Sequence, residues 1–171
     1  MNNTYQDNTN QTAQRTGDRE ELRQLVCFKL GAEDFGVDIS KVQEINRMVE
    51  ITKIPQSPSF VEGVINLRGR IIPVVDLRRR FGFELLGERT KENRIIVIET
   101  TSSTIGFIVD AVTEVLRIKS SSIEPTPEMV SSGVDVRYIE GVAMLTEQLL
   151  IVLDTDKVFS AEETRSIAAI N

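Results

Sequence analysis

Residues 60–78 read FVEGVINLRGRIIPVVDLR, and this stretch decides the fold. Two runs rich in β-branched residues, Val61–Leu67 and Ile71–Leu77, flank the tripeptide Arg68-Gly69-Arg70. Short apolar runs on either side of a turn that contains glycine are typical of a β-hairpin. We therefore predict two antiparallel strands with the glycine at their tip.

The same pattern returns later in the chain. Residues 138–142 read YIEGV and lie 78 positions after FVEGV at 60–64. Upstream, IGF at 105–107 lies 70 positions after FGV at 35–37, and Pro125 follows Pro55 at the same spacing. We interpret these ordered matches as a duplicated unit with eight residues inserted between Pro125 and Tyr138; the alternative is chance similarity among strands rich in Val and Ile.

Each copy reads as a hairpin, a short helical turn, an extended segment with proline and a second hairpin. The other predicted strand pairs are Leu25–Leu30 with Phe35–Ile39, Arg94–Thr100 with Ile105–Val109, and Ile139–Leu145 with Leu149–Leu153. Ser40 and Gln43 have the spacing of a helix capping box, so we predict about two helical turns with Val42 and Ile45 on one face.

Roughly 50–60 residues in each copy suffice for a small barrel with a marginal core, so two barrels are expected to share an apolar interface. The predicted class is mostly all-β, because no room remains for the crossover helices of a parallel α/β sheet. We expect a disordered tail at 1–21, two barrels at about 25–90 and 91–155, and an amphipathic C-terminal helix at 156–171.

Composition excludes several kinds of site. The chain has 171 residues, 20 Lys+Arg against 26 Asp+Glu, one Cys and no His. Without His there is no Ser-His-Asp or Cys-His machinery and no His-ligated zinc. A single Cys forms no internal disulfide, which fits a reducing compartment. We expect a cytoplasmic protein that is not inserted in the membrane and has no catalytic residues, metal or cofactor.

The residues that carry reactive groups have structural interpretations. Asp76 and Asp154 end equivalent strands, so each is expected to accept backbone N–H groups of the following turn. A hydrolase with paired carboxylates is the alternative. Cys27 lies in mid-strand with no base to activate it, which favours a buried thiol over a nucleophile.

Two other features suit partner binding. The counterpart of Arg68 in the second copy is Thr146, so the fold does not require an arginine at this tip. Arg68 and Arg70 can recognise carboxylates or carbonyl groups, although a solvated surface is equally consistent with them and with Arg78–Arg80. Met129 follows Pro125 and Pro127, where it either meets a partner or covers a barrel end.

The hairpin at 60–78 resembles the signature of the CheW family, the bacterial chemotaxis coupling proteins. FGVDI at 35–39, KVQEI at 41–45, IGFIVDAV at 105–112 and PTPE at 125–128 extend the resemblance over about residues 22–165. The resemblance implies two five-stranded SH3-like barrels and a non-enzymatic adaptor. Such an adaptor joins the cytoplasmic tips of methyl-accepting chemotaxis receptors to the histidine kinase CheA, at the inner face of the membrane.

The resemblance also assigns residues to partners. Those implied at the receptor groove are Val42, Glu44, Gly63, Arg68, Ile95 and Val112. Those implied at contacts with the regulatory domain of the kinase are Met129, Arg47 and Ile51. Many relatives have arginine directly after the Glu-Ile pair, where this chain has Asn46 and then Arg47.

Two alternatives to this function stay open. One is a CheW-like adaptor of a chemosensory pathway that does not drive flagella. The other is a small β-barrel that binds nucleic acid, which the net charge of −6 and the few aromatic residues disfavour.

Overall fold

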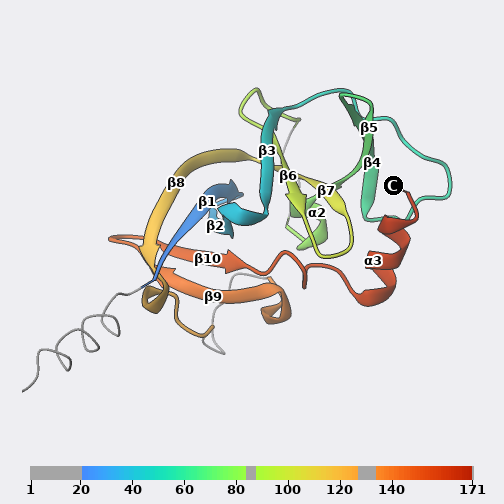
Figure 1. Cartoon of the computed structure of the whole chain (residues 1–171). Coiled ribbons are helices and arrows are strands. Elements are labelled where there is room, and N and C mark those ends of the chain that lie inside the picture. Colours follow the sequence, from blue (N-terminus) through green and yellow to red (C-terminus); the bar gives the residue numbers. More distant parts are fainter. Residues whose placement is uncertain (1–20, 84–87, 127–133, 171) are drawn as a thin grey trace, which may run out of the picture.

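The structure, a computed structural model, describes residues 21–83, 88–126 and 134–170 (Figure 1). Residues 1–20 of the expected tail, and Met129 with its loop, lie outside the described residues. The strands are β1 (Leu22–Leu30), β2 (Glu33–Asp38), β3 (Val42–Arg47), β4 (Val61–Leu67), β5 (Arg70–Asp76), β6 (Arg94–Glu99), β7 (Thr104–Val109), β8 (Ala111–Lys119), β9 (Ile139–Met144) and β10 (Leu149–Leu153). The helices are α2 (Leu77–Arg80) and α3 (Ala161–Ala168), with 3-10 turns η1 (Ile39–Lys41), η2 (Ser120–Ser122) and η3 (Val136–Tyr138).

The strands form two five-stranded sheets, which confirms the mostly all-β class and the paired SH3-like barrels. One sheet has the order β8-β1-β2-β10-β9, and we call it the β1 barrel. The other has the order β3-β6-β7-β5-β4, and we call it the β6 barrel. The four predicted hairpins are present as antiparallel pairs, whereas β2–β10 and β5–β7 pair in parallel.

The two copies of the repeat exchange their first hairpins. The β1 barrel takes β1 and β2 from the first copy and β8, β9 and β10 from the second. The β6 barrel takes β3, β4 and β5 from the first copy and β6 and β7 from the second. The barrels are therefore intertwined, and neither coincides with residues 25–90 or 91–155.

The prediction of about two helical turns after Ser40 is wrong. Only the single turn η1 is helical there, and the strand β3 begins at Val42. Asp38 rather than Ser40 caps the turn, with its Oδ1 accepting a hydrogen bond from the Ser40 N–H at 2.9 Å. β3 pairs with β6 over most of its length, so hydrogen bonding to a distant strand overrides the local capping spacing.

The C-terminal helix is shorter than the expected 156–171. α3 begins at Ala161 because Ser160 and Glu163 form a reciprocal capping box. The Ser160 hydroxyl accepts from the Glu163 N–H at 3.1 Å, and a Glu163 carboxylate oxygen accepts from the Ser160 N–H at 2.8 Å.

A short bridge closes each barrel at an equivalent glycine. Thr52 pairs with Val64 and Glu124 pairs with Val142, each through two backbone hydrogen bonds of 2.8–2.9 Å. A Cβ on Gly63 would lie 2.4 Å from the Thr52 carbonyl oxygen, and one on Gly141 would lie 2.6 Å from that of Glu124. Thr52 and Glu124 are 72 positions apart, whereas Pro55 and Pro125 are 70 apart, so the expected match of the two prolines is not kept.

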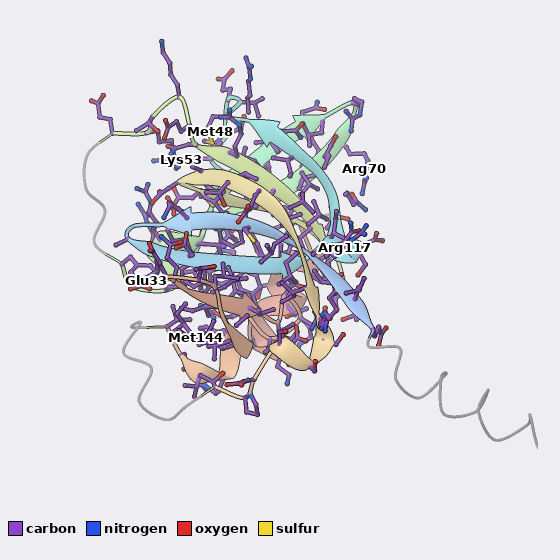
Figure 2. The ribbon with its side chains drawn as sticks, turned by 90° about the vertical axis from the view of Figure 1, so that its left-hand side faces the viewer. Glu33, Met48, Lys53, Arg70, Arg117 and Met144 are labelled. Atoms are coloured by element: carbon purple, nitrogen blue, oxygen red, sulfur yellow. The ribbon has the colours of Figure 1, made fainter. Side chains whose placement is uncertain are left out.

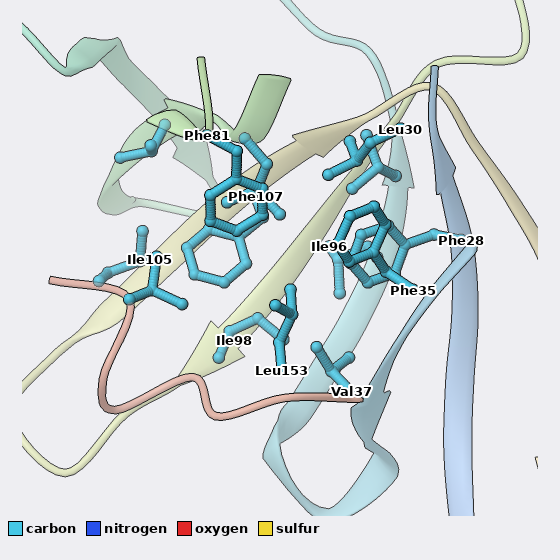
Figure 3. Packing of buried hydrophobic residues seen from close by; sticks show 14 of the residues in the cluster. Phe28, Leu30, Phe35, Val37, Phe81, Ile96, Ile98, Ile105, Phe107 and Leu153 are labelled. Atoms are coloured by element: carbon cyan, nitrogen blue, oxygen red, sulfur yellow. The ribbon is translucent and has the colours of Figure 1, made fainter. Parts of the chain in front are cut away.

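Side chains of neighbouring residues in one strand enter different cores. Val26 and Phe28 face a core shared by the two barrels, whereas Cys27 between them faces the inside of the β1 barrel. In the β6 barrel, Ile96 enters the shared core and Ile95 the barrel interior. Figure 3 shows aromatic and aliphatic side chains from both barrels meeting in the shared core. Burial on both faces explains the continuous apolar runs in the sequence.

Candidate functional site

Local backbone geometry fixes the β4–β5 hairpin tip. Arg68 and Gly69 both have positive φ, 52° and 83°, as the central residues of a type I′ turn require. The Asn66 side-chain oxygen accepts a hydrogen bond from the Gly69 N–H at 2.9 Å. The turn thus holds the Cα of Arg68 in one place at the outer end of the β6 barrel.

An ion pair then orients the Arg68 side chain. Its Nη2 lies 2.7 Å from Oε1 and 2.6 Å from Oε2 of Glu44, which β3 presents from the same sheet. The hydrogen bond from Arg68 lowers the pKa of Glu44, and the Glu44 carboxylate raises the pKa of Arg68. The Arg68 side chain is nevertheless 77% exposed, so it is oriented and accessible to a partner.

Arg70 extends this polar surface across the sheet. Its Nη2 donates to the Thr104 hydroxyl at 3.2 Å, and its Nη1 lies 3.5 Å from the Gln43 side-chain oxygen. Gln43 in turn donates to Glu99 at 3.0 Å. Figure 2 shows Arg70 on the outside of the barrel, well away from Met48. The outer ends of β3, β5 and β7 therefore form one hydrogen-bonded surface.

The structure brings Glu44 and Arg68 together at the hairpin tip. The other expected receptor residues are partly or fully buried. Val42 and Val112 are half-buried against the shared core. Ile95 is fully buried inside the β6 barrel, and Gly63 is buried under the closing bridge. Ile95 and Gly63 therefore support the surface from within.

Of the expected kinase contacts, two lie in the described part of the chain. Arg47 is exposed at the end of β3. Ile51 is half-buried and packs against the interior core of the β6 barrel together with Met48. Met129 lies outside the described residues.

The carboxylates of Asp76 and Asp154 and the thiol of Cys27 have structural roles. Asp76 Oδ1 accepts from the Arg78 N–H at 3.0 Å and Asp154 Oδ1 from the Asp156 N–H at 3.1 Å, as predicted for strand ends. Burial raises the pKa of the Cys27 thiol to about 11, so it carries little thiolate at neutral pH. Among the residues described, no three of Cys, Asp and Glu form a group that could hold a metal ion. In the same ranges, no helix is long and apolar enough to cross a membrane.

Arg80 has a structural role that sequence reasoning missed, because Arg78–Arg80 read as a solvated run. Its guanidinium lies 5.2–5.5 Å from the ring centroids of Phe60, Tyr138 and Phe159. Both its Nη atoms contact Glu163 of α3 at 2.7 Å, and it also donates to the Val158 carbonyl. With its side chain 15% exposed, Arg80 holds the C-terminal segment against the shared core.

Two intertwined five-stranded barrels on a shared core define a paired SH3-like β protein. The chain matches the CheW-like domain over residues 24–163 and belongs to that family. It is 38% identical to a chemotaxis protein CheW of Klebsiella aerogenes over 142 residues, 82% of this chain and 84% of that protein. A chemotaxis protein CheW of Treponema pallidum is 35% identical over 155 residues, which are 87% of this chain and 89% of that protein. The crystal structure of scaffolding protein TtCheW from Thermoanaerobacter tengcongensis matches with a TM-score of 0.75 at 40% identity, over 85% of this chain and 93% of that one.

Proposed function

We propose that this protein is a non-enzymatic chemotaxis scaffold that couples methyl-accepting receptors to the histidine kinase CheA. The observation that carries the proposal is the match of residues 24–163 to the CheW-like domain, with relatives named as chemotaxis proteins along most of the chain. In this proposal the protein is cytoplasmic and reaches the inner face of the membrane through receptor arrays.

The hairpin-tip arginine gives the proposal a physical basis. Glu44 and the I′ turn hold Arg68 in one orientation, so little side-chain entropy is lost when a partner binds. A guanidinium held in this way can donate to carboxylates or to the exposed carbonyl groups of a helical receptor tip. Many weak contacts of this kind, repeated across an array, give high avidity without a large individual interface.

Receptor binding is tested by Arg68→Ala and Val42→Asp, measured with a soluble cytoplasmic fragment of a cognate receptor. We expect each variant to raise the Kd by at least about tenfold while the far-UV circular dichroism stays unchanged. Arg137→Ala is the matched control, because Arg137 is also exposed and paired with a carboxylate but lies in another turn. Normal receptor binding by the test variants, or loss of their fold, would contradict the assignment.

Kinase binding is tested by Met129→Ala. Under the proposal this variant associates less with the CheA regulatory domain and binds the receptor fragment as the unchanged protein does. Equal loss of both partners would instead indicate a general defect in folding.

A further inference from the structure

A cavity opens between the β6–β7 turn and the segment that leads from β10 into α3, and we call it the α3 cavity. Figure 1 shows the turn and this segment close together. The cavity has a volume of about 350 Å³, which is typical of sites for small molecules. Ile105 and Phe159, both buried, give it an apolar side. Its other lining residues are small or polar: Thr100, Thr101, Ser102, Thr155, Asp156, Ala161, Thr164 and Arg165.

Thr155 brings to this cavity a hydroxyl group that has no partner within the described residues. The residue is only 5% exposed, and what remains accessible lines the cavity. Its side chain neither donates nor accepts a hydrogen bond in the part of the chain that the structure describes. Because a nearly buried hydroxyl group without a hydrogen bond lowers stability, the fold itself gives no reason for a threonine here.

A positive charge at the α3 cavity is also not neutralised in the described ranges. There, Arg165 forms no ion pair with a carboxylate. Asp156, the acidic residue of the lining, is compensated, since its Oδ1 accepts from the Thr101 N–H at 2.9 Å and its Oδ2 lies 3.9 Å from Lys41 Nζ. The Ala161 N–H, at the start of α3, has no acceptor among the described residues. The groups left unmatched are hydrogen-bond donors, which favours an anion.

The internal repeat shows that the fold does not need these hydroxyl groups. The turn residues 100–102 are Thr-Thr-Ser, whereas residues 30–32, 70 positions earlier, are Leu-Gly-Ala. Thr155 corresponds to Leu77, 78 positions earlier, which is fully buried in the shared core. One copy of the repeat thus has apolar residues or glycine where the other presents hydroxyl groups to a cavity. A ligand that forms hydrogen bonds gives a physical reason for the difference.

We propose that the α3 cavity binds a small organic anion. Its carboxylate or phosphate group contacts the Arg165 guanidinium and the Thr155 hydroxyl, and its apolar part lies against Phe159 and Ile105. A guanidinium is a planar donor that matches both kinds of oxyanion, and a hydroxyl group can donate to the same oxygens. The volume of the cavity leaves room for an organic group beside the charged one. The proposed site is separate in function from the scaffold role, because its ligand is a small molecule and not a protein.

The test is a titration of the isotope-labelled, full-length protein followed by amide chemical shifts in NMR spectra. The probes are phenyl phosphate, benzoate, inorganic phosphate and the neutral benzyl alcohol. We expect phenyl phosphate or benzoate to shift the amides of Thr101, Thr155 and Ala161 in a saturable way, with a Kd of about 1 mM or below. The tighter of these two probes identifies the phosphate or the carboxylate as the preferred group. Inorganic phosphate and benzyl alcohol should each bind at least about fivefold more weakly.

Two variants test the groups that contact the anion. Thr155→Val removes the hydroxyl group and keeps the shape of the side chain, and Arg165→Gln removes the charge. We expect each to weaken binding of the preferred anion about five- to tenfold. Thr155→Val should unfold at a urea midpoint no lower than that of the unchanged protein, because a hydroxyl group without a partner does not stabilise the fold. Arg117→Gln is the matched control, since Arg117 is likewise exposed and forms no ion pair in the described ranges but lies on β8.

Each contrary outcome removes a stated part of the proposal. No saturable shift at these amides with either organic anion, up to about 10 mM, would overturn the site. Unchanged affinity in Thr155→Val or in Arg165→Gln would contradict the contact assigned to that residue. Equal binding of benzyl alcohol would overturn the choice of an anion, and equal binding of inorganic phosphate would overturn the organic part. A lowered urea midpoint in Thr155→Val would show that the hydroxyl group serves the fold.

Discussion

The Arg68 side chain has both a fixed orientation and high exposure. The carboxylate that orients it comes from β3, and the backbone that carries it is held by the I′ turn. Because exposed ion pairs contribute little to stability, this pair is better explained by orientation than by folding energy. The repeat marked Arg68 as a candidate for partner binding, since its counterpart is Thr146, but no spacing in the sequence predicts its ion pair with Glu44.

A charge swap separates orientation from direct contact. Glu44→Arg combined with Arg68→Glu keeps an ion pair at the tip and reverses its direction. We expect this double variant to keep the denaturation midpoint of the unchanged protein and still to bind the receptor fragment weakly, because the exposed group would be a carboxylate. Receptor affinity restored to the original value would mean that only the ion pair matters, and that Arg68 makes no contact of its own.

At the scale of the element, Gly63 and Gly141 make room for the two bridges that close the barrels. Each lies where the backbone of the closing bridge approaches too closely for a side chain. For Gly63→Ala and Gly141→Ala we expect losses in the free energy of unfolding of about 1–3 kcal/mol or more, from overpacking against a carbonyl oxygen. Urea denaturation followed by circular dichroism measures both.

The matched control is Gly36→Ala. A Cβ there would meet Leu25 and Leu150 at 3.5 Å, an ordinary contact distance, and the backbone needs no positive φ. This variant should stay within about 1 kcal/mol of the unchanged protein. Destabilisation of all three variants to the same degree would show that the close approach is not the cause.

Arg80 links α2 to the C-terminal segment. Breaking a largely buried ion pair leaves a carboxylate without its partner, so Arg80→Ala should lower the free energy of unfolding by about 2–4 kcal/mol. Arg137→Ala removes an exposed pair and should change it little. Hydrogen exchange should show the amides of α3 less protected in Arg80→Ala alone. Unchanged α3 protection in that variant would contradict the proposed link.

The Arg80 contacts also predict a dependence on pH. Partial burial opposes ionisation of Glu163, but the Ser160 N–H and the Arg80 guanidinium outweigh it and lower the pKa of the carboxyl. The stabilising contribution is therefore present above the ordinary glutamate pKa and is lost as the pH falls through the lowered value. Below that range, the difference in stability between the unchanged protein and Arg80→Ala should shrink.

Sequence patterns predicted the hairpins correctly, but they predicted neither the strand β3 nor the role of Arg80, and the difference has a physical reason. The hairpins were predictable because turn residues and β-branched runs act locally. β3 was not, because its partner β6 lies about fifty residues away and the local spacing of Ser40 and Gln43 favours a helical turn. Arg80 was missed for a similar reason, since its aromatic neighbours come from three distant segments.

At the scale of the whole molecule, the exchange of hairpins makes each barrel depend on both copies of the repeat. Internal similarity predicted the duplication and the shared core, but it does not tell which copy supplies a strand. The topology predicts that residues 1–90 and 91–171, produced separately, show neither the circular dichroism spectrum nor the cooperative unfolding of the full chain. A cooperative transition in either fragment would contradict the requirement for strands from both copies.

The measurement that most directly tests the proposed coupling uses all three components. The protein, a receptor cytoplasmic fragment and the cognate CheA are sedimented alone, in pairs and together, and kinase autophosphorylation is measured in each mixture. The account predicts that the protein co-sediments with either partner and that kinase activity changes only in the ternary mixture. Binding to neither partner, or kinase activity unaffected by the protein in the ternary mixture, would contradict it.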